Sequence, residues 1–397
     1  MTNQAQNFDV MIAGGGPAGA CAAIHLSVRG ARVLLAEQKR FPREKLCGEF
    51  ISPECLEHFA RLGCEERMLS AGGARLLETV FYARGGGRVS VPSEWFGSGG
   101  ATALGLSRAE MDAQLLERAR EAGVSVLEES HASGLLMDNG RVRGVQLKNG
   151  SGGVQDIHSL VTIDATGRTR ALARRVEKQG LENHPARKRP ARLVAFKAHL
   201  EGARAAEGNC EIYFYRGGYG GLSMVEGGLS NLCFIASARD VRACGNEPEK
   251  VLREVVFKNR RAAWTLEHAR AASPWLAVSL EGFGRRGLVP ADGLLAAGDA
   301  ASFIDPFTGS GMLMALESGE LAAQAILKHL PALRDGAGFE KLSGEYRTRY
   351  KERFQSRLRA CAALRRAAFV PRLAEIMIFM VGASDRVRRR LARATRR

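Results

Sequence analysis

A glycine-rich turn near the start of the chain constrains the fold more than any other feature. Phe8–Ala13 is a short apolar run, as expected of a buried parallel strand, and it leads into Gly14-Gly15-Gly16-Pro17-Ala18-Gly19. Helical spacing follows over Pro17–Arg29, and a second apolar run, Arg32–Ala36, ends at Glu37. A strand, a Gly-x-Gly-x-x-Gly turn, a helix and a second strand ending in an acid are typical of a dinucleotide-binding βαβ unit.

Each residue type in this unit suits the binding of a dinucleotide for a chemical reason. Gly14, Gly16, Ala18 and Gly19 let the backbone approach a pyrophosphate at the helix start, where free N–H groups and the helix dipole favour anions. Glu37 is placed to accept hydrogen bonds from the ribose hydroxyls. The alternative is a glycine-rich turn before an ordinary helix. The presence of every contextual element favours the nucleotide site.

A second glycine-rich stretch, far along the chain, indicates FAD rather than NAD as the cofactor. Leu294–Ala297 is an apolar strand that places Asp299 at its carboxyl end, where ligands bind in α/β sheets. The stretch Gly309-Ser310-Gly311-Met312 then opens a long helix over Ser310–Leu330. Unpaired N–H groups at such a helix start can face an anionic flavin. We therefore expect FAD, with the alternative that Asp299 only caps a turn.

The charge of the chain is unevenly placed. Its 397 residues include 58 Lys and Arg against 42 Asp and Glu, a net charge of +16. Residues 351–397 hold fourteen Lys and Arg and three Asp and Glu, so this tail carries +11 and the remainder about +5. Apolar Val370–Met380 precedes an arginine-rich end, a combination typical of a helix lying on an anionic membrane surface. The alternative is a solvated terminal helix. Nucleic acid is not expected as a partner, since basic and aromatic residues do not interleave outside the tail.

The cysteines and the two ends of the chain bear on location. The eight cysteines form no CxxC pair and have no His partner at metal spacing, so free thiols and no metal site are expected. Met1-Thr2-Asn3-Gln4 lacks the features of a secretory signal, and Ile376–Ala383 is far shorter than the roughly 20 apolar residues of a membrane span. We expect a cytoplasmic protein with, at most, peripheral contact to the inner face of a membrane.

The succession of patterns predicts an α/β fold with a Rossmann-like FAD-binding domain, an inserted antiparallel β substrate domain and C-terminal helices. The FAD-binding domain would combine residues 1–70, 100–175 and 280–330. The substrate domain would combine 71–99 and 176–279, because Arg192–Ile235 alternates between apolar and polar residues. Residues 331–397 would form a helical segment with the basic tail.

These motifs resemble the FAD-dependent superfamily that holds para-hydroxybenzoate hydroxylase, geranylgeranyl reductases and flavin-dependent halogenases. The resemblance covers most of residues 8–330, and Phe41–Gly48 and the Asp-Pro-x-Thr-Gly-x-Gly block at 305–311 are most similar to the reductase branch. It implies that Arg108, which begins Arg-x-x-x-Asp with Asp112, contacts the cofactor. A solvated Arg at a helix start is the alternative.

The same resemblance implies roles around the flavin ring. Asp299 would bind the ribityl-pyrophosphate region, and Gly309, Ser310, Gly311 and Met312 would lie against the isoalloxazine. Cys47 and Gly48 would lie near the ring face, with Cys47 a candidate catalytic residue. The alternative for Cys47 is a buried small residue without reactivity.

The resemblance is incomplete in the substrate domain. Reductases of this branch usually carry Tyr-x-Trp-x-Phe-Pro, but Gly218–Gly227 lacks the Trp and the Phe-Pro. The halogenase Trp-x-Trp-x-Ile-Pro is also missing, and the hydroxylase Asp-Gly motif is altered at Asp164–Arg168. Glu226 in this glycine-rich stretch is a second candidate catalytic residue, with a solvated loop carboxylate as the alternative. Tyr219 and Tyr213 are candidate substrate contacts.

The sequence thus predicts an FAD-dependent oxidoreductase that acts on an apolar small molecule. NAD(P)H or another reductant would donate electrons transiently, because no second nucleotide fingerprint is visible. Reduction of carbon–carbon double bonds in an isoprenoid- or lipid-like substrate is the first expectation. Hydroxylation of an aromatic or polyketide-like substrate is the alternative, and halogenation is less favoured. The alternative from a different functional class is a protein that binds FAD but has no catalytic activity.

Overall fold

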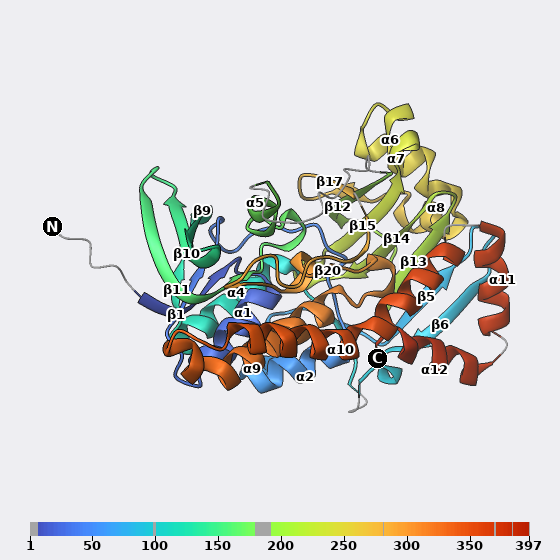
Figure 1. The fold of residues 1–397 in the computed structure, drawn as a ribbon. Helices are drawn as coiled ribbons and strands as arrows, with labels where there is room; N and C mark the ends of the chain where they lie inside the picture. The colour runs from blue at the N-terminus through green and yellow to red at the C-terminus, as the bar shows by residue number, and fades with distance from the viewer. Residues whose placement is uncertain are drawn as a thin grey trace.

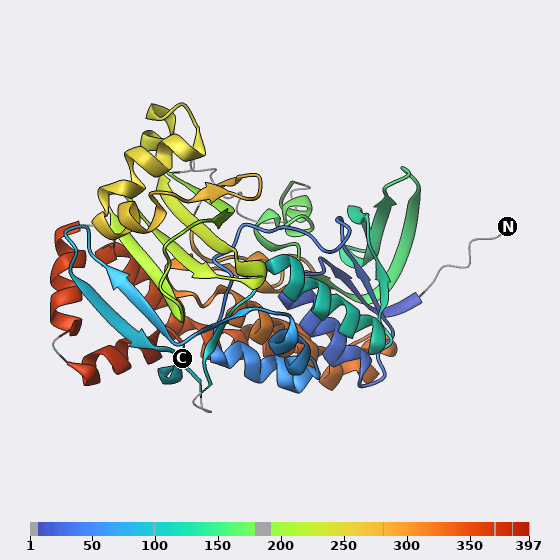
Figure 2. The same ribbon diagram turned by 180° about the vertical axis from the view of Figure 1, so that it is seen from behind.

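The computed structural model describes residues 7–97, 101–178, 192–280, 282–368, 371–382 and 384–396, and the arrangement is drawn in Figures 1 and 2. Two sheets dominate it, and helices cover much of one face of each. The expected α/β architecture is confirmed, with a mixed sheet for the cofactor, a largely antiparallel second sheet and helices at the C-terminal end.

The first sheet is parallel where the cofactor motif lies. Its strands, in spatial order, are β8 (Ser125–Leu127), β2 (Val33–Ala36), β1 (Asn7–Ala13), β11 (Val154–Asp164), β10 (Arg141–Asn149) and β9 (Ser130–Asp138), with β19 (Leu294–Ala296) paired to β11. Pairing is parallel among β8, β2, β1, β11 and β19, and antiparallel along β11, β10 and β9. The late strand β19 therefore returns to the sheet beside β11. This brings the two glycine-rich stretches to the same edge.

Alternation along the central strands divides the core into two layers. Val10 and Ile12 of β1 belong to a large apolar core on the helical side, whereas Met11 and Ala13 belong to a second core on the other face. The helices of the large core are α1 (Pro17–Ser27), α2 (Pro53–Leu62), α3 (Glu65–Ser70), α4 (Arg108–Glu121), α9 (Gly311–Arg334) and α10 (Phe339–Ala368). The short helix α5 (Ala173–Lys178) contributes Val176 to the second core.

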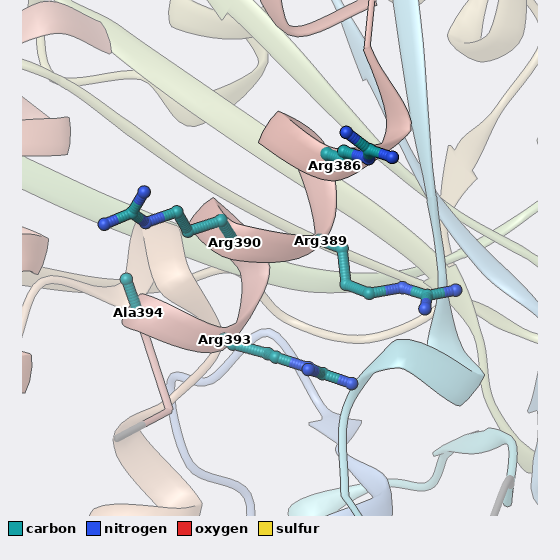
Figure 3. Close-up of a pocket in the computed structure, with 5 residues that line it drawn as sticks. All are labelled: Arg386, Arg389, Arg390, Arg393 and Ala394. Atoms are coloured by element: carbon teal, nitrogen blue, oxygen red, sulfur yellow. The ribbon is translucent and has the colours of Figure 1, made fainter.

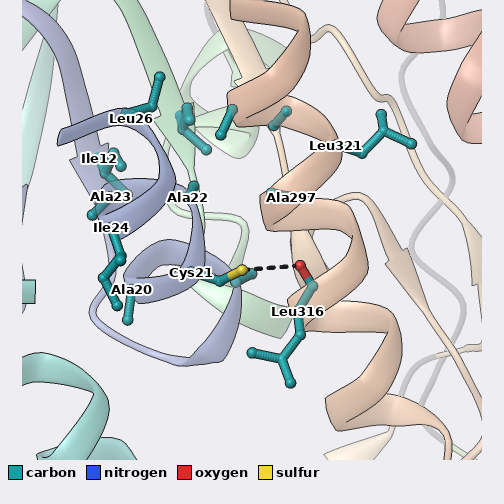
Figure 4. Close-up of a cluster of buried hydrophobic side chains, with 14 of the residues drawn as sticks. Ile12, Ala20, Cys21, Ala22, Ala23, Ile24, Leu26, Ala297, Leu316 and Leu321 are labelled. Atoms are coloured by element: carbon teal, nitrogen blue, oxygen red, sulfur yellow. Dashed lines mark hydrogen bonds between the residues drawn. The ribbon is translucent and has the colours of Figure 1, made fainter. Parts of the chain in front are cut away.

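Helix α1 packs very closely on α9. Small residues, including Ala18 and Ala22, line this contact, and the Cys21 thiol donates to the Leu316 carbonyl over 3.3 Å (Figure 4). A side chain at Gly319 would collide with the carbonyl oxygen of Ala18, so only glycine permits this approach. The start of α1 is thereby fixed relative to the helix that follows the second glycine-rich stretch.

The second sheet lies beside the first in Figure 1. Its strands, in spatial order, are β16 (Arg270–Ala271), β12 (Leu193–Glu201), β15 (Ser230–Ser237), β14 (Gly218–Met224), β13 (Asn209–Tyr215), β5 (Glu78–Tyr82) and β6 (Arg88–Pro92), with β17 (Leu276–Leu280) paired to β12. Only the pairing of β13 with β5 is parallel among these. Two small sheets complete the described strands: β3 (Phe50–Ile51), β7 (Ala103–Gly105) and β4 (Ala74–Leu76), and β18 (Gly284–Arg285) with β20 (Ser302–Phe303).

The two faces of the second sheet have different environments. One face carries Phe196 and Tyr213 and is covered by the helices α6 (Ala238–Ala243), α7 (Pro248–Glu254) and α8 (Arg260–Leu266). The other face carries Ala195 and Phe214, which pack with Phe303 of β20 from the cofactor side. The last helices, α11 (Pro371–Gly382) and α12 (Asp385–Ala394), lie at the β6 edge (Figure 2).

Candidate functional site

The glycine turn after β1 is shaped by close backbone contacts. Gly14 has φ +108°, and its N–H donates to the Ala36 carbonyl over 2.8 Å. A side chain at Gly19 would collide with the Gly14 carbonyl oxygen. With Pro17 in the first turn of α1, the backbone N–H groups at this helix start remain open to an anion.

Glu37 takes part in building the turn itself. Its Oε2 accepts from the Gly15 N–H over 2.9 Å, and its Oε1 accepts from the Lys39 N–H over 3.0 Å. The carboxylate is buried, and a guanidinium nitrogen of Arg43 lies 3.6 Å from it. Glu37 therefore stands at the end of β2 beside the glycine turn, and its contact with a ribose stays a prediction.

Two arginines converge on the turn from other elements. Arg108, at the start of α4, is buried and bonds Asp112 through Nε and Nη2 at 2.9 and 2.7 Å. Arg43 lies 3.1 Å from the same carboxylate. A Cβ added to Gly16 would lie 3.8 Å from an Nη atom of each arginine. The space above Gly16 is thus faced by two fixed guanidinium groups, which suit the two charges of a pyrophosphate.

A further pair of cations lies toward Asp299. Burial lowers the pKa of Lys45, and the neighbouring Arg43, Arg108 and Arg168 lower it further. Burial raises the pKa of Asp299, although Arg168, Lys45 and Arg108 oppose that rise. Cations therefore outnumber acids where the loop after β2 meets the turn after β19. This donor set fits the diphosphate of FAD.

The 305–311 stretch joins the cofactor side to the second sheet. The buried Tyr219 hydroxyl donates to Asp305 over 2.7 Å, and the Tyr219 ring meets Phe307 edge-on with centroids 5.4 Å apart. Burial raises the pKa of Asp305, while the Tyr219 hydroxyl and the Phe307 N–H oppose that rise. Gly309 has φ +62° and ends this turn before α9 begins. Tyr219 therefore supports the loop that is expected to face the flavin.

Cys47 lies in the loop after β2, facing the second sheet. Its carbonyl accepts from the Asn231 side chain over 3.0 Å, and its thiol accepts from the Glu49 N–H over 3.4 Å. Burial raises the pKa of the Cys47 thiol, with Arg108 opposing that rise. The raised pKa keeps the thiol protonated at neutral pH, which does not favour a thiolate nucleophile.

A buried charged network stands next to Cys47. Glu49 and Lys197 are 0% and 1% exposed, and the Lys197 ammonium lies 3.0 Å from Glu49 and also pairs with Glu44. Glu49 Oε1, the oxygen near Lys197, also accepts from the Arg108 N–H over 2.9 Å. Glu49 Oε2 lies 2.7 Å from His199 Nε2. Lys197 and His199 are two residues apart on β12, so both side chains point to the same face of the sheet.

This network does not suit a metal ion. Among the described residues, the group able to offer three ligand atoms is Glu44, Glu49 and His199. The Lys197 ammonium, however, already pairs with both carboxylates. A cation in that position would meet strong repulsion from Lys197, so the group is best described as an ion-pair network.

The remainder of this sheet face is apolar and aromatic. Phe214 lies 5.5 Å from Phe307 between ring centroids, and Phe81 stacks on Phe214 at 6.3 Å. Phe283 stacks on Phe303 at 5.1 Å within the same cluster. An apolar region thus adjoins the polar group at Cys47.

The structure separates some residues that the sequence analysis grouped. Tyr213 lies on the helix-covered face and donates to Glu211 over 2.7 Å, so it is not brought to this site. Glu226 accepts from the Ser107 N–H over 2.9 Å, and thereby holds the start of α4 rather than facing the aromatic cluster. Arg108 is buried and ion-paired, which contradicts the alternative of a solvated Arg. Tyr219 lies on the sheet face turned toward the cofactor domain, and Cys47 lies in the cofactor-domain loop that faces the second sheet.

Several site residues escaped the sequence analysis. Arg43 and Lys45 carried a signal, since they flank Glu44 in a loop already assigned to the cofactor. Lys197 and His199 carried a weaker one, as two basic residues in alternation within an apolar strand. Glu49 had none, because its partners lie about 150 positions away.

The fold and the site together define an FAD-dependent oxidoreductase. The chain matches the family described as FAD binding domain over residues 7–355, and it belongs to that family. No helix among the described residues has the length and apolar character needed to span a bilayer.

Relatives with known names fall in several groups. The chain is 28% identical over 355 residues to digeranylgeranylglycerophospholipid reductase 2 of Methanopyrus kandleri, covering 87% of this chain and 83% of that protein. Its fold is similar to that of a geranylgeranyl bacteriochlorophyll reductase-like protein from Thermoplasma acidophilum, with a TM-score of 0.77, 19% identity and coverage of 97% and 96%. It is equally similar in fold to a flavin-dependent brominase, with a TM-score of 0.78, 21% identity and coverage of 99% and 95%.

Proposed function

We propose that this protein reduces carbon–carbon double bonds in an apolar, isoprenoid- or lipid-like substrate. The observation that carries the proposal is the face of the second sheet that adjoins the cofactor loop. Phe214 of this face packs against Phe307 of the 305–311 stretch, and the loop that carries Cys47 is bonded to the same sheet through Asn231. An apolar substrate could be held by the aromatic residues and receive a proton from Cys47. The relative from Methanopyrus kandleri bears the name of a reductase with such a substrate, which supports the same conclusion.

FAD, when bound, would supply the hydride for such a reduction. Gly14, Gly16, Gly19 and Arg108 would hold its diphosphate, with Asp299 at the far side. NAD(P)H or another reductant would supply electrons from solution.

The residues of this chain would supply the proton. Cys47 would donate from its Sγ, and the Glu49, His199 and Lys197 network beside it would return a proton to that region. His199 and Lys197 contact different oxygens of Glu49, so Lys197 keeps its contact with the buried carboxylate whichever way His199 bonds.

Monooxygenation is the second candidate, and a specific feature of β14 favours it. After Tyr219, the positions of Trp and Phe in the reductase motif are occupied by Gly221 and Ser223. A Cβ on Gly221 would lie 3.2 Å from the Ile212 side chain, so Ile212 already fills the space beside this strand. The surface offered to a substrate therefore differs from that of the reductases. Because of this difference, hydroxylation of an aromatic substrate with molecular oxygen is the alternative function.

Turnover with and without oxygen tests the proposal. FAD-loaded protein would be supplied with NADPH or dithionite and either a polyprenyl lipid or an aromatic polyketide. We expect product from the lipid under anaerobic conditions, with each reduced bond gaining a hydride and a proton. Product that forms only in air and contains one added oxygen atom would establish monooxygenation in its place.

A further inference from the structure

The two last helices have faces that the fold does not cover. On the inner side, Ile378 of α11 is buried in the aromatic cluster, and Ala392 of α12 packs with Val91 and Phe96. On the outer side, Phe379 is 80% exposed and Met380 is 64% exposed. Adjacent large apolar side chains this exposed mark a contact site more often than a plain solvated surface.

Four arginines stand on the outer side of α12. Arg386, Arg389, Arg390 and Arg393 line a surface hollow together with Ala394, as Figure 3 shows, and we refer to these four as the basic face. All four are exposed, and no carboxylate in the described part of the chain forms an ion pair with any of them. The charge of this face is therefore available to an anionic partner.

The basic face is held in a fixed orientation. Arg388, on the inner side, donates to the Ser90 carbonyl over 3.0 Å and lies 5.6 Å from the Trp95 ring centroid. Arg396 is buried and donates to the Gly309 carbonyl over 3.1 Å. Arg388 and Arg396 thus contribute to the fold, and Arg389 of the basic face also lies 5.1 Å from the Trp95 ring centroid while remaining exposed.

We propose that the basic face and the exposed Phe379 and Met380 form a docking surface for an anionic lipid bilayer. Phosphate headgroups would meet the guanidinium groups, and the two apolar side chains would enter the boundary between headgroups and acyl chains. A nucleic acid would satisfy the four charges but would leave Phe379 and Met380 in water. The pairing of charge with exposed apolar surface on neighbouring helices therefore favours a membrane.

The position of α11 adds a consequence for the substrate. Ile378 and Val381 of α11 contact the aromatic cluster that includes Phe307, while Phe379 faces outward from the same helix. Helix α11 would then separate the bilayer from the proposed substrate region by its own width. An apolar substrate could pass beside it without crossing water. This consequence rests on the proposed function, whereas membrane docking does not.

Sedimentation of the full-length, FAD-loaded protein with vesicles tests the docking surface without any turnover. The probes are vesicles of phosphatidylcholine alone and vesicles that also contain phosphatidylglycerol. We expect binding only to the anionic vesicles, and weaker binding at 1 M salt than at 0.1 M, since the Debye length falls from about 10 Å to about 3 Å. Changing the four arginines of the basic face to Gln should reduce the bound fraction by about tenfold or more.

A matched control removes the same charge elsewhere. Exposed cations on α6 and α7 are Arg239, Arg242, Lys250 and Arg253. Their change to Gln should leave vesicle binding within about twofold of the original protein, because they lie away from α12. If the two variants lost vesicle binding equally, the binding would depend only on the net charge of the protein, and the proposal would be overturned.

The apolar part is tested separately. The double variant Phe379→Ser and Met380→Ser keeps every charge, and it should lose binding that survives in high salt. Melting temperatures and bound FAD would show that the variants are folded. Failure of the original protein to bind anionic vesicles at low salt would refute the proposal. So would preferential binding of duplex DNA that is lost with the basic face but unaffected by the serine variant.

Discussion

At the scale of single residues, the cofactor site depends on positions where a side chain would fill space meant for the ligand. Gly16 is the clearest of these, because its missing Cβ faces Arg43 and Arg108 without touching any backbone. Gly14 and Gly19 differ, since a side chain there would strike backbone atoms and disturb the fold itself. A substitution at Gly16 should therefore weaken ligand binding without disturbing the fold.

The first prediction concerns this glycine. Gly16→Val should reduce FAD affinity by more than about tenfold, or about 1.4 kcal/mol, because the branched side chain occupies the space of the diphosphate. Bound flavin measured by absorbance is the readout, with circular dichroism as a check on folding. Gly344→Ala, at an open position on α10, is the control. If the Gly16→Val variant kept its full flavin content, the diphosphate could not be bound at this turn.

The second prediction concerns Asp299. Asp299→Ala should weaken FAD binding by about 1–3 kcal/mol, the loss expected for a hydrogen bond to a charged group. An unchanged dissociation constant, measured by titration, would leave Asp299 without a role at the cofactor.

The same carboxyl predicts a pH effect on the FAD-free protein. Burial raises the pKa of Asp299 above its usual 3.8, so the folded protein holds this proton more tightly than the unfolded chain. The free energy of unfolding therefore falls as pH rises from the usual value through the raised one. Asp299→Asn lacks this charge and should melt at a higher temperature than the original protein at neutral pH. The two should converge in acid.

The third prediction concerns the buried network. Lys197→Met leaves Glu49 buried without its ammonium partner, and loss of one partner from a buried pair costs about 3–5 kcal/mol. Urea unfolding at several pH values measures it. Arg204→Met breaks an exposed pair with Glu267 and should cost no more than about 1 kcal/mol at any pH.

At the scale of elements, the end of the chain is tied to the loop that precedes α9. The Ser310 hydroxyl donates to the Thr395 carbonyl over 2.8 Å, and Arg396 bonds the Gly309 carbonyl. Arg357 of α10 also donates to the Arg396 carbonyl. The last turn after α12 therefore restrains the start of α9, although the two are about 85 residues apart.

The fourth prediction follows from this tie. A chain that ends at Ala394 should exchange the amide hydrogens of residues 307–311 faster than the full chain, because the loop loses hydrogen bonds worth about 1 kcal/mol each. FAD should also dissociate faster from it. Ser310→Ala removes one of these bonds and should show a smaller change. Identical exchange in all three proteins would mean that the loop is held by its other contacts.

At the scale of the whole molecule, the cofactor site is assembled from widely separated segments. The glycine turn, the loop at 43–49, the start of α4 and the turn after β19 all meet at one edge of the first sheet. Bound FAD would contact all of these segments, so it should oppose unfolding of the molecule as a whole.

The fifth prediction is a ligand-dependent stability. FAD at about 100 times its dissociation constant should raise the free energy of unfolding by about 2.7 kcal/mol. FMN lacks the adenosine and the second phosphate that the glycine turn and Glu37 are expected to hold, so it should have a much smaller effect. Thermal unfolding with each flavin measures the difference. An equal shift from both would show that the adenosine half does not bind at the turn.

Much of the cofactor domain was readable from the sequence because its signals are local. A strand, a glycine turn and a helix start depend on neighbouring residues, so β1, α1 and the acid at the end of β2 were all predicted. The strand β19 and the long helix α9 were also predicted from their own patterns. The resemblance to a flavoprotein family rested on these same stretches, and the family match over residues 7–355 confirms it.

Other features were decided only by the tertiary structure. Alternation along β13 separates Tyr213 from Phe214, but it cannot say which face meets the cofactor domain, and the sequence analysis placed Tyr213 at the site. The ion pairs of Glu49 with Lys197 join segments about 150 residues apart, and no local pattern reports such a meeting. The tail shows the same limit, since composition revealed its charge while packing against β6 determined which arginines face outward. Sequence periodicity thus determines the elements and their two faces, and only the packing of distant elements determines what each face meets.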